Sequence, residues 1–195
     1  VKDYIDISDQ DLEELAVKIT EAGINVEKVI SNHIDHLVIG KVISCVDHPD
    51  SDHLHLCQVD VGNEELQQIV CGAPNVREGL KVIVALPGAV LPGDFVIKAS
   101  KIRGVESNGM ICALYELGLE EKTDESYARG IEELSDDAPI GKDPLVYLGL
   151  ESTLYELDIH KHRNNDCYYH IGFAYEIAAI LNRKVTLPER SYKES

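Results

Sequence analysis

The sequence predicts an α+β fold in which a small β-barrel is inserted into a helical domain that is split between the two ends of the chain. Three observations support this prediction. Apolar residues recur at helical spacing near the N-terminus, they do so again near the C-terminus, and short segments rich in β-branched residues lie between them. The expected boundaries give residues 1–37 and 151–195 to the split helical domain and residues 38–150 to the barrel.

The first helix is predicted between Ser8 and Gly23, where Leu12, Leu15 and Ile19 form an apolar stripe. Ser8 is the expected N-cap, because its hydroxyl can accept a hydrogen bond from the first turn of the helix. Gly23 is expected to end the helix, because glycine adopts the left-handed conformation without steric cost.

A second helix is predicted over residues 165–181, with Asn182 as its expected end. Its expected apolar face consists of Ile171, Ala174, Tyr175, Ala178 and Leu181. Each terminal segment taken alone is too short to bury a core of useful size. We therefore expect the two helices to pack against each other.

Several short strands, separated by glycine, proline and asparagine turn signals, are expected between the helices. They cover residues 37–46, 53–60, 66–71, 81–86, 95–99 and 104–113. Five principal strands at such close spacing fit a partly open barrel of the OB-fold type. Residues 120–144 are polar and acidic and are expected to form a long loop after the strands.

The overall charge opposes nucleic-acid binding, but one stretch of the chain is basic. With 18 Lys and Arg against 35 Asp and Glu, the formal net charge is -17, and such a field repels phosphate backbones. Between Arg77 and Arg103, however, basic residues outnumber acidic ones. A local basic face is therefore expected on an acidic protein.

Nothing in the sequence predicts a membrane protein or a secreted protein. No segment approaches the roughly 18 consecutive apolar residues of a membrane helix, and the N-terminus lacks a secretory signal pattern. The cytoplasm is the expected location. The 5 cysteines include no C-x-x-C pair and are expected to be reduced thiols.

A set of motifs runs in order through the middle of the chain. The motifs are Val38-x-Gly40-x-Val42, His48-Pro49-x-Ser51-Asp52-x-Leu54, Cys57-x-Val59-Asp60-x-Gly62, residues 69–76, Gly88-x-x-Leu91-Pro92-Gly93, Lys101-x-Arg103-Gly104-x-x-Ser107-x-Gly109-Met110 and residues 116–119. Together they resemble the tRNA-binding domain of bacterial phenylalanyl-tRNA synthetase beta subunits. Related domains occur at the end of many bacterial methionyl-tRNA synthetases and as free-standing proteins.

Both terminal segments extend this resemblance to the rest of the beta subunit's N-terminal region. The segments that carry it are residues 20–27 before the barrel and Glu156-Leu157-Asp158 with Gly172-x-Ala174-x-Glu176 after it. The family's T-P-N-R-A-D stretch is replaced here by residues 160–166, which keep Arg163 and Asp166 but contain one extra residue. The role of that loop in the family is therefore not carried over.

The resemblance implies a non-catalytic module that contributes tRNA binding to the attachment of phenylalanine to its tRNA in translation. The parent enzyme would be a ligase that uses ATP and magnesium at sites outside this chain, so the chain alone is expected to be inactive. The implied partners are tRNA specific for phenylalanine and the alpha subunit, in a heterotetramer of two alpha and two beta subunits. No cofactor, no metal and no membrane contact are expected for this chain.

The residues expected to contact tRNA combine positive charge with hydrogen-bonding groups near the barrel groove. They are Lys81, Lys98, Lys101, Arg103, Ser107 and Asn75. A solvated strand edge is the competing interpretation of the basic residues, and an ordinary turn is the competing interpretation of Asn75. Phe95 and Tyr115 are too few to predict an aromatic platform for single strands.

Other classes of function remain open at this point. The chain could be a structural scaffold within the synthetase with little RNA contact, or a free-standing tRNA-binding protein. A metal-dependent enzyme is a third possibility, because His53, His55 and Cys57 alternate along one strand with His48 nearby. The motifs contain neither a catalytic nucleophile paired with a general base nor a phosphate-binding glycine loop, so no catalytic residue is predicted.

Overall fold

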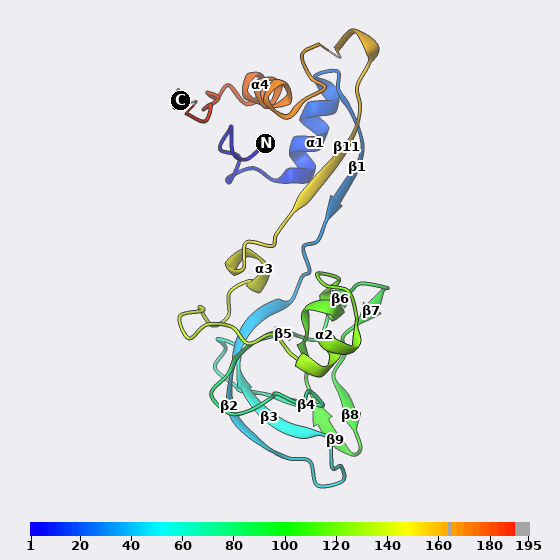
Figure 1. Cartoon of the computed structure of the whole chain (residues 1–195), viewed down its shortest axis with the longest axis vertical. Coiled ribbons are helices and arrows are strands. Elements are labelled where there is room, and N and C mark those ends of the chain that lie inside the picture. The colour runs from blue at the N-terminus through cyan, green and yellow to red at the C-terminus, as the bar shows by residue number, and fades with distance from the viewer. Residues whose placement is uncertain (164, 190–195) are drawn as a thin grey trace, which may run out of the picture. The chain divides into compact units, whose positions relative to one another are not determined.

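The computed structural model describes residues 1–163 and 165–189, and it divides into two compact units. The terminal unit combines Val1–Asn32 with the chain from Ser152 onward, and the sheet unit is His33–Glu151 (Figure 1). Residues 164 and 190–195, which belong to the third predicted segment, lie outside the described residues.

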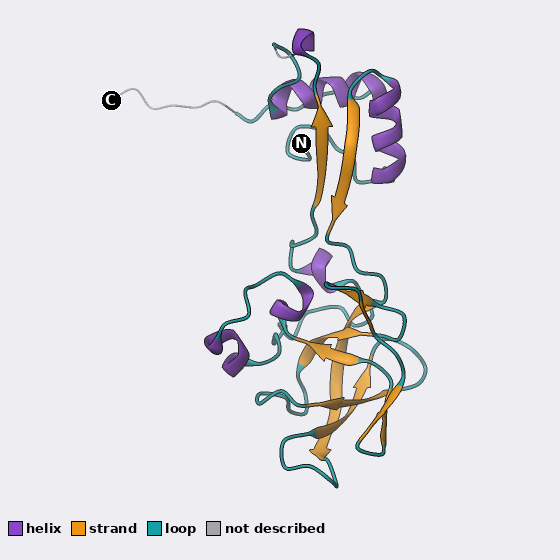
Figure 2. Cartoon of the chain, turned by 90° about the vertical axis from the view of Figure 1, so that its right-hand side faces the viewer, coloured by secondary structure: helices purple, strands orange, loops and turns teal. Residues whose placement is uncertain are grey.

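The terminal unit contains a two-stranded antiparallel sheet as well as helices, so the prediction of a purely helical domain was incomplete. Its elements are α1 (Leu12–Glu21), β1 (Asn25–Ser31), β11 (Thr153–Asp158), a 3-10 turn at Lys161–Arg163 and α4 (His170–Leu181). β1 and β11 run side by side, with Asn25 opposite Asp158 and Ser31 opposite Thr153 (Figure 2). These strands were not predicted, because each pairs only with a strand from the other terminal segment.

The core of the terminal unit joins both terminal segments of the chain. Leu15 and Ile19 of α1 are fully buried in one cluster with Ala174 and Ile177 of α4. The hydroxyl of Tyr155 on β11 donates a hydrogen bond of 2.6 Å to the carbonyl oxygen of Leu12. Residues of α1 and α4 thus share one apolar cluster, and residues of the two strands complete it.

An ion pair also links the first residues of the chain to the segment after α4. The Arg183 guanidinium donates to both Asp9 carboxylate oxygens at 2.7 and 2.6 Å, and to the carbonyl oxygen of Asp6 at 2.6 Å. These hydrogen bonds lower the pKa of Asp9 to about 2.

Helix α1 begins later than predicted, and its N-cap is Asp11 rather than Ser8. The Asp11 carboxylate accepts a hydrogen bond of 2.9 Å from the Glu14 N–H. Ser8 is unavailable as a cap because its N–H and its hydroxyl both donate to Asp6 Oδ1. The predicted end is correct, since Gly23 follows the helix with a φ of +100°.

Helix α4 begins at His170, whereas the apolar pattern predicted a start at residue 165. The preceding residues form a separate turn, in which the Cys167 N–H donates to the carbonyl oxygen of Arg163 at 2.9 Å. Asn182 ends the helix as predicted, in the left-handed conformation with φ 52° and ψ 47°. The placement of Tyr175 on the apolar face was wrong, because its side chain is 53% exposed.

The sheet unit is built on an antiparallel sheet of five strands in the order β10-β5-β2-β3-β4. The curl of the sheet is visible along β2 and β3 in Figure 1. These strands are β2 (Leu37–Asp47), β3 (His55–Asp60), β4 (Gln67–Cys71), β5 (Lys81–Ala85) and β10 (Met110–Cys112). The first four match the predicted strands closely. The α+β class is therefore confirmed, because the unit combines this sheet with short helices.

The segment between β5 and β10 differs from the prediction, because it folds into small hairpins rather than long strands. Residues 95–99 provide only β7 (Phe95–Val96), which pairs with β6 (Val90–Leu91). Residues 104–113 are divided between β9 (Val105–Ser107), which pairs with β8 (Ser100–Ile102), and β10. The division falls at Gly109, whose φ is +139°.

The acidic segment predicted as a loop is partly helical and packs against the sheet. It contains α2 (Asp124–Arg129) and is followed by α3 (Pro144–Tyr147), while a 3-10 turn at Leu114–Leu117 precedes it. Ile131, Leu134 and Ala138 are buried, and Leu134 forms a β-bridge with Lys81. The charged residues therefore form the outer face of a segment that has its own apolar anchors.

Candidate nucleic-acid interface

The sheet unit contains a groove with a cavity volume of about 1000 Å³. Its walls come from β4, β7, β8, β10, the 3-10 turn at Leu114–Leu117 and α2. Lys98 is the one residue of the predicted tRNA site that lines it. The groove therefore lies beside the predicted basic surface and is not identical with it.

Three aromatic side chains from separate segments line this groove, namely Phe95 of β7, Tyr115 of the 3-10 turn and Tyr127 of α2. Phe95 is 58% exposed and Tyr127 is 63% exposed, so both side chains remain in contact with solvent. The ammonium of Lys122 lies 5.6 Å from the centre of the Tyr115 ring and 5.5 Å from that of Tyr127. Such cation–π contacts keep a positive charge at the edge of the groove.

The position of Tyr127 follows from the local sequence around α2. Thr123 caps the helix by accepting a hydrogen bond of 3.1 Å from the Ser126 N–H, and the Ser126 hydroxyl accepts one of 2.9 Å from the Thr123 N–H. Arg129, the last residue of the helix, pairs with Glu120 in the segment before it. This capping fixes a short helix that presents Tyr127 to the groove.

Lys101 and Arg103 lie together on the β8–β9 hairpin. Lys101 is exposed, and its Nζ is 3.6 Å from Glu106 Oε1 on the paired strand. Arg103 occupies the turn with a φ of +46°, and its guanidinium donates to the carbonyl oxygen of Asp50 at 2.8 Å. Both side chains keep hydrogen-bonding capacity for a phosphate, because each guanidinium or ammonium has several donors.

Lys81 and Ser107 are already engaged within the protein. The Lys81 ammonium donates to the carbonyl oxygens of Asp136 and Ala138 at 2.5 and 2.6 Å. Ser107 is only 1% exposed, and its hydroxyl accepts from the Val70 N–H and donates to the Gly109 carbonyl oxygen. These contacts connect neighbouring segments of the sheet unit.

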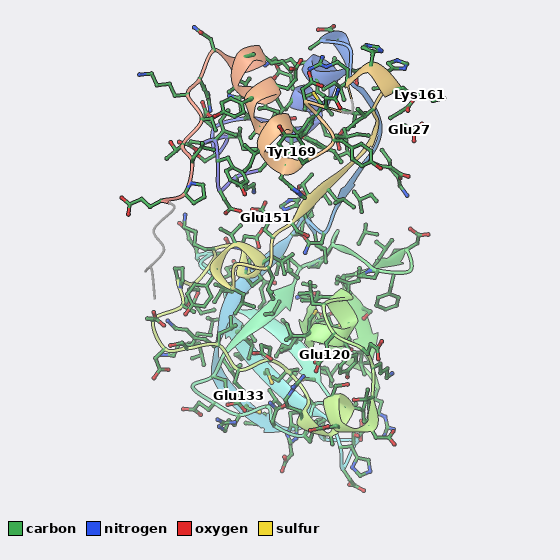
Figure 3. All side chains as sticks on the ribbon, turned by 45° about the horizontal axis from the view of Figure 1, so that its top comes forward. Glu27, Glu120, Glu133, Glu151, Lys161 and Tyr169 are labelled. Carbon is green, nitrogen blue, oxygen red and sulfur yellow. The ribbon has the colours of Figure 1, made fainter. Side chains whose placement is uncertain are left out.

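Asn75 holds the segment after α2 by both polar atoms of its amide. Its Oδ1 accepts from the Ile131 N–H at 3.0 Å, and its Nδ2 donates to the Ile131 carbonyl oxygen at 2.9 Å. The same Nδ2 is 3.2 Å from Glu133 Oε1, and Glu133 also receives two hydrogen bonds from Arg77. Glu133 is labelled in Figure 3.

These contacts lead to a prediction for Asn75→Ala. The change leaves the buried Ile131 backbone without its partners, and we expect a loss of about 1–3 kcal/mol in the free energy of unfolding of the sheet unit. Urea denaturation measures this loss. Asn63→Ala, at an exposed turn asparagine, is the matched control and should change stability by less than about 0.5 kcal/mol. Unchanged stability with weakened tRNA binding would instead indicate a direct RNA contact by Asn75.

Two other titratable groups line the groove. Burial raises the pKa of the Cys71 thiol to about 11, so this cysteine is a neutral thiol near pH 7. Burial also raises the pKa of Glu116, while a hydrogen bond from the Ala113 N–H and the charge of Lys122 act in the opposite direction. All five cysteines are free.

The histidine and cysteine residues considered as zinc ligands do not converge. Cys57 points into the core and is fully buried, whereas His53 is exposed. The buried His48 ring lies against the β8–β9 hairpin, with Nε2 at 3.3 Å from the Ile102 carbonyl oxygen. Within residues 1–163 and 165–189, no three His, Cys, Asp or Glu side chains are arranged to hold a metal ion.

The sequence pattern revealed neither Tyr127 as a groove residue nor Lys122 as the cation over its ring. Both belong to the acidic segment that was predicted to be a loop. The available signal was the pattern Thr123-x-x-Ser126, which is a helix N-terminus, followed by an aromatic residue. That pattern predicts a helix but does not predict which groove the helix faces.

The sheet unit belongs to a class of putative tRNA-binding domains. The family described as "Putative tRNA binding domain" matches residues 37–143, and the chain belongs to this family. Over nearly its whole length the chain is similar to beta subunits of phenylalanine–tRNA ligase. It is 50% identical to that of Geobacillus kaustophilus (strain HTA426), over 99% of this chain and 24% of the relative. It is 48% identical to that of Bacillus subtilis (strain 168), over 98% of this chain and 24% of the relative.

The chain therefore spans about a quarter of the length of these relatives. Among solved structures, a MetRS related protein from Pyrococcus horikoshii aligns with a TM-score of 0.39 and 25% identity, over 54% of this chain and 84% of that one. The C-terminal domain of Plasmodium vivax p43 aligns with a TM-score of 0.38 and 22% identity, over 54% of this chain and 56% of that one. None of the described helices has the length and apolar character needed to cross a membrane.

Proposed function

We propose that this chain is the tRNA-binding portion of a phenylalanine–tRNA ligase beta subunit and contributes RNA contact, not catalysis, to the attachment of phenylalanine to its tRNA. The observation that carries this proposal is the similarity over 99% of the chain to such a beta subunit, together with the tRNA-binding family match on the sheet unit. ATP and magnesium are assigned to the part of the enzyme outside this chain.

The proposed assembly and architecture follow from the same similarity. Phenylalanine-specific tRNA and the alpha subunit are the proposed partners, in a cytoplasmic heterotetramer of two alpha and two beta subunits. The sheet unit is proposed to be an OB-fold, because its five antiparallel strands form a curled sheet (Figure 2). We place this domain at residues 38–150, inserted into a domain split between residues 1–37 and 151–195.

The proposed phosphate contacts are Lys98, Lys101 and Arg103. All three are exposed and follow one another over β7 to β9, so one strand of RNA backbone can meet them in succession. Lys81, Asn75 and Ser107 are proposed to stabilise the segments around the groove. Their polar atoms already form hydrogen bonds with other segments of the sheet unit.

A double substitution of Lys101 and Arg103 by Ala is expected to weaken tRNA binding for all tRNA species alike, because phosphate contacts carry no sequence information. Binding of tRNA by the chain is expected to be weak and sensitive to salt, because few basic residues act against a net charge of -17. The slope of log affinity against log salt should fall by about 2 in the double variant. Fluorescence anisotropy across a salt series measures both effects.

The matched control is the double substitution of Lys2 and Lys184 by Ala, which removes the same charge from exposed positions of the terminal unit. The control should keep the salt slope of the unsubstituted chain. Equal weakening in both double variants would mean that only net charge matters, and the assignment to the β8–β9 hairpin would be wrong.

A structural scaffold with little RNA contact is the second candidate function. Its specific support is the acidity of the chain, -17 overall, and the internal engagement of Lys81, Ser107 and Asn75. A gel-shift titration with tRNA at low salt separates the two candidates, since the scaffold predicts no shift and the tRNA-binding module predicts one.

The purified chain is expected to be catalytically inactive, because its groove offers aromatic rings, a neutral thiol and a hydrogen-bonded carboxyl group rather than an activated nucleophile. Phenylalanine-dependent pyrophosphate exchange measures adenylate formation directly. Exchange activity that stays with the chain through repurification would contradict the proposal that catalysis lies elsewhere in the enzyme.

A further inference from the structure

We propose that the groove binds an unpaired base of an RNA strand, which stacks on the rings of Phe95 and Tyr127 while Lys98 and Lys122 hold the adjoining phosphates. This inference rests on the proposed function and names the part of a tRNA that enters the groove. It adds an aromatic contact to the phosphate contacts of the β8–β9 hairpin.

The exposure of the two rings is the first observation behind it. Phe95 and Tyr127 are 58% and 63% exposed although they line the same cavity. A large aromatic ring left in water gives up the favourable burial that such a side chain usually obtains. Stacking on a base recovers that burial and accepts any base, because every base has a flat aromatic face.

Two lysines supply positive charge for the phosphates on either side of such a base. Lys122 lies over the Tyr115 and Tyr127 rings, so its ammonium is held at one wall. Lys98 is exposed in the loop after β7 and lines the groove from another wall. An RNA strand carries a phosphate on both sides of each base, so the proposal assigns one lysine to each of these two phosphates.

The remaining lining allows close approach of a flat group. Gly72, Ala73 and Gly109 contribute small side chains or none at all. Glu116 is the acidic lining residue, and its carboxylate accepts the Ala113 N–H at 2.8 Å. The cavity volume of about 1000 Å³ exceeds the space that one base requires.

The occupant is expected to be unpaired, because bases in a double helix are stacked on each other and do not present their faces to a protein. The loops and ends of a tRNA supply such bases. An apolar peptide would also use the aromatic rings, but it has no phosphates to place beside Lys98 and Lys122.

The test uses the full 195-residue chain and three probes in fluorescence anisotropy at low salt. The probes are tRNA, a short single-stranded RNA and a blunt RNA duplex of the same length. Phe95→Ala and Tyr127→Ala should each weaken binding of the single strand and of tRNA about tenfold. Tyr127→Phe, which keeps the ring, should retain binding, whereas Tyr127→Leu should behave like Tyr127→Ala.

Tyr168→Ala is the matched control, since Tyr168 is 73% exposed in the terminal unit, and it should change nothing. Because exposed rings are replaced, circular dichroism should show unchanged folding for all variants. The single strand should also shift the ring resonances of Phe95 and Tyr127 in NMR spectra, and the duplex should not.

Every other outcome contradicts the base-binding groove, the proposed function or both. If tRNA binding depends on Lys101 and Arg103 but not on Phe95 and Tyr127, the base-binding groove is wrong and the proposed function stands. Equal binding of duplex and single strand would also overturn the groove. If the chain binds the single strand through both rings but does not bind tRNA, the proposed function fails and the groove remains. Binding to none of the three probes overturns both.

Discussion

Leu15→Asp is expected to unfold the terminal unit while the sheet unit remains folded. Leu15 is fully buried in the cluster that joins α1 to α4, and an unpaired carboxylate there costs several kcal/mol. Because Ala174 and Ile177 of α4 belong to the same cluster, loss of α1 should also expose α4. The sheet unit has separate apolar clusters around Ile83 and Val84.

Hydrogen exchange of the full chain measures this effect residue by residue. Protection should be lost over His170–Leu181 and kept over Lys81–Ala85. Val17→Asp is the matched control, because Val17 is 57% exposed on the same helix and gains the same charge. Protection of α4 that survives in Leu15→Asp would mean that the two terminal segments fold separately, and the split domain would have to be abandoned.

Gly172→Ala is expected to destabilise the terminal unit by about 3 kcal/mol. A Cβ atom on Gly172 would lie 1.6 Å from the carbonyl oxygen of Asp166, so the loop before α4 would have to move. That loop is fixed to the helix, because Arg163 donates to Asp166 Oδ2 at 2.8 Å and to Glu176 Oε2 at 2.7 Å. Figure 3 shows Tyr169 at the start of the same helix.

The expected loss of stability in Gly172→Ala is opposite in sign to the usual effect of a Gly→Ala substitution in a helix. In a helix without such a contact, Gly→Ala stabilises by roughly 0.5–1 kcal/mol. Ala179→Gly, at an exposed position of α4, is the control and should cost only that amount. Thermal or urea unfolding of the terminal unit distinguishes the two cases, and a more stable Gly172→Ala variant would refute the close approach.

The anchor formed by Arg163, Asp166 and Glu176 also gives a physical role to the divergent loop at residues 160–166. The sequence retained Arg163 and Asp166 despite an extra residue. The Arg163 guanidinium donates to the carboxylates of both Asp166 and Glu176, and these hydrogen bonds raise the pKa of Arg163 further above its usual range. The two retained residues therefore serve the packing of α4.

Local patterns were sufficient for the elements whose signal lies within one segment. The apolar stripe of Leu12, Leu15 and Ile19 defined α1, and β-branched runs between turn signals defined β2 to β5. The motifs from Val38 to Leu119 identified the tRNA-binding family, because many residue types in order leave few alternatives. Such features depend on neighbours in the sequence, and these neighbours can be read directly.

Tertiary structure alone decided the features that depend on distant partners. Strands β1 and β11 exist because each supplies the hydrogen bonds of the other from opposite ends of the chain. Lys81 and Asn75 are residue types that commonly contact RNA. In the structure, however, both donate hydrogen bonds to carbonyl oxygens of the acidic segment. Phe95, Tyr115 and Tyr127 became one groove only through folding. Sequence supplies the chemical groups, whereas the close packing of remote segments decides which of them remain available to a ligand.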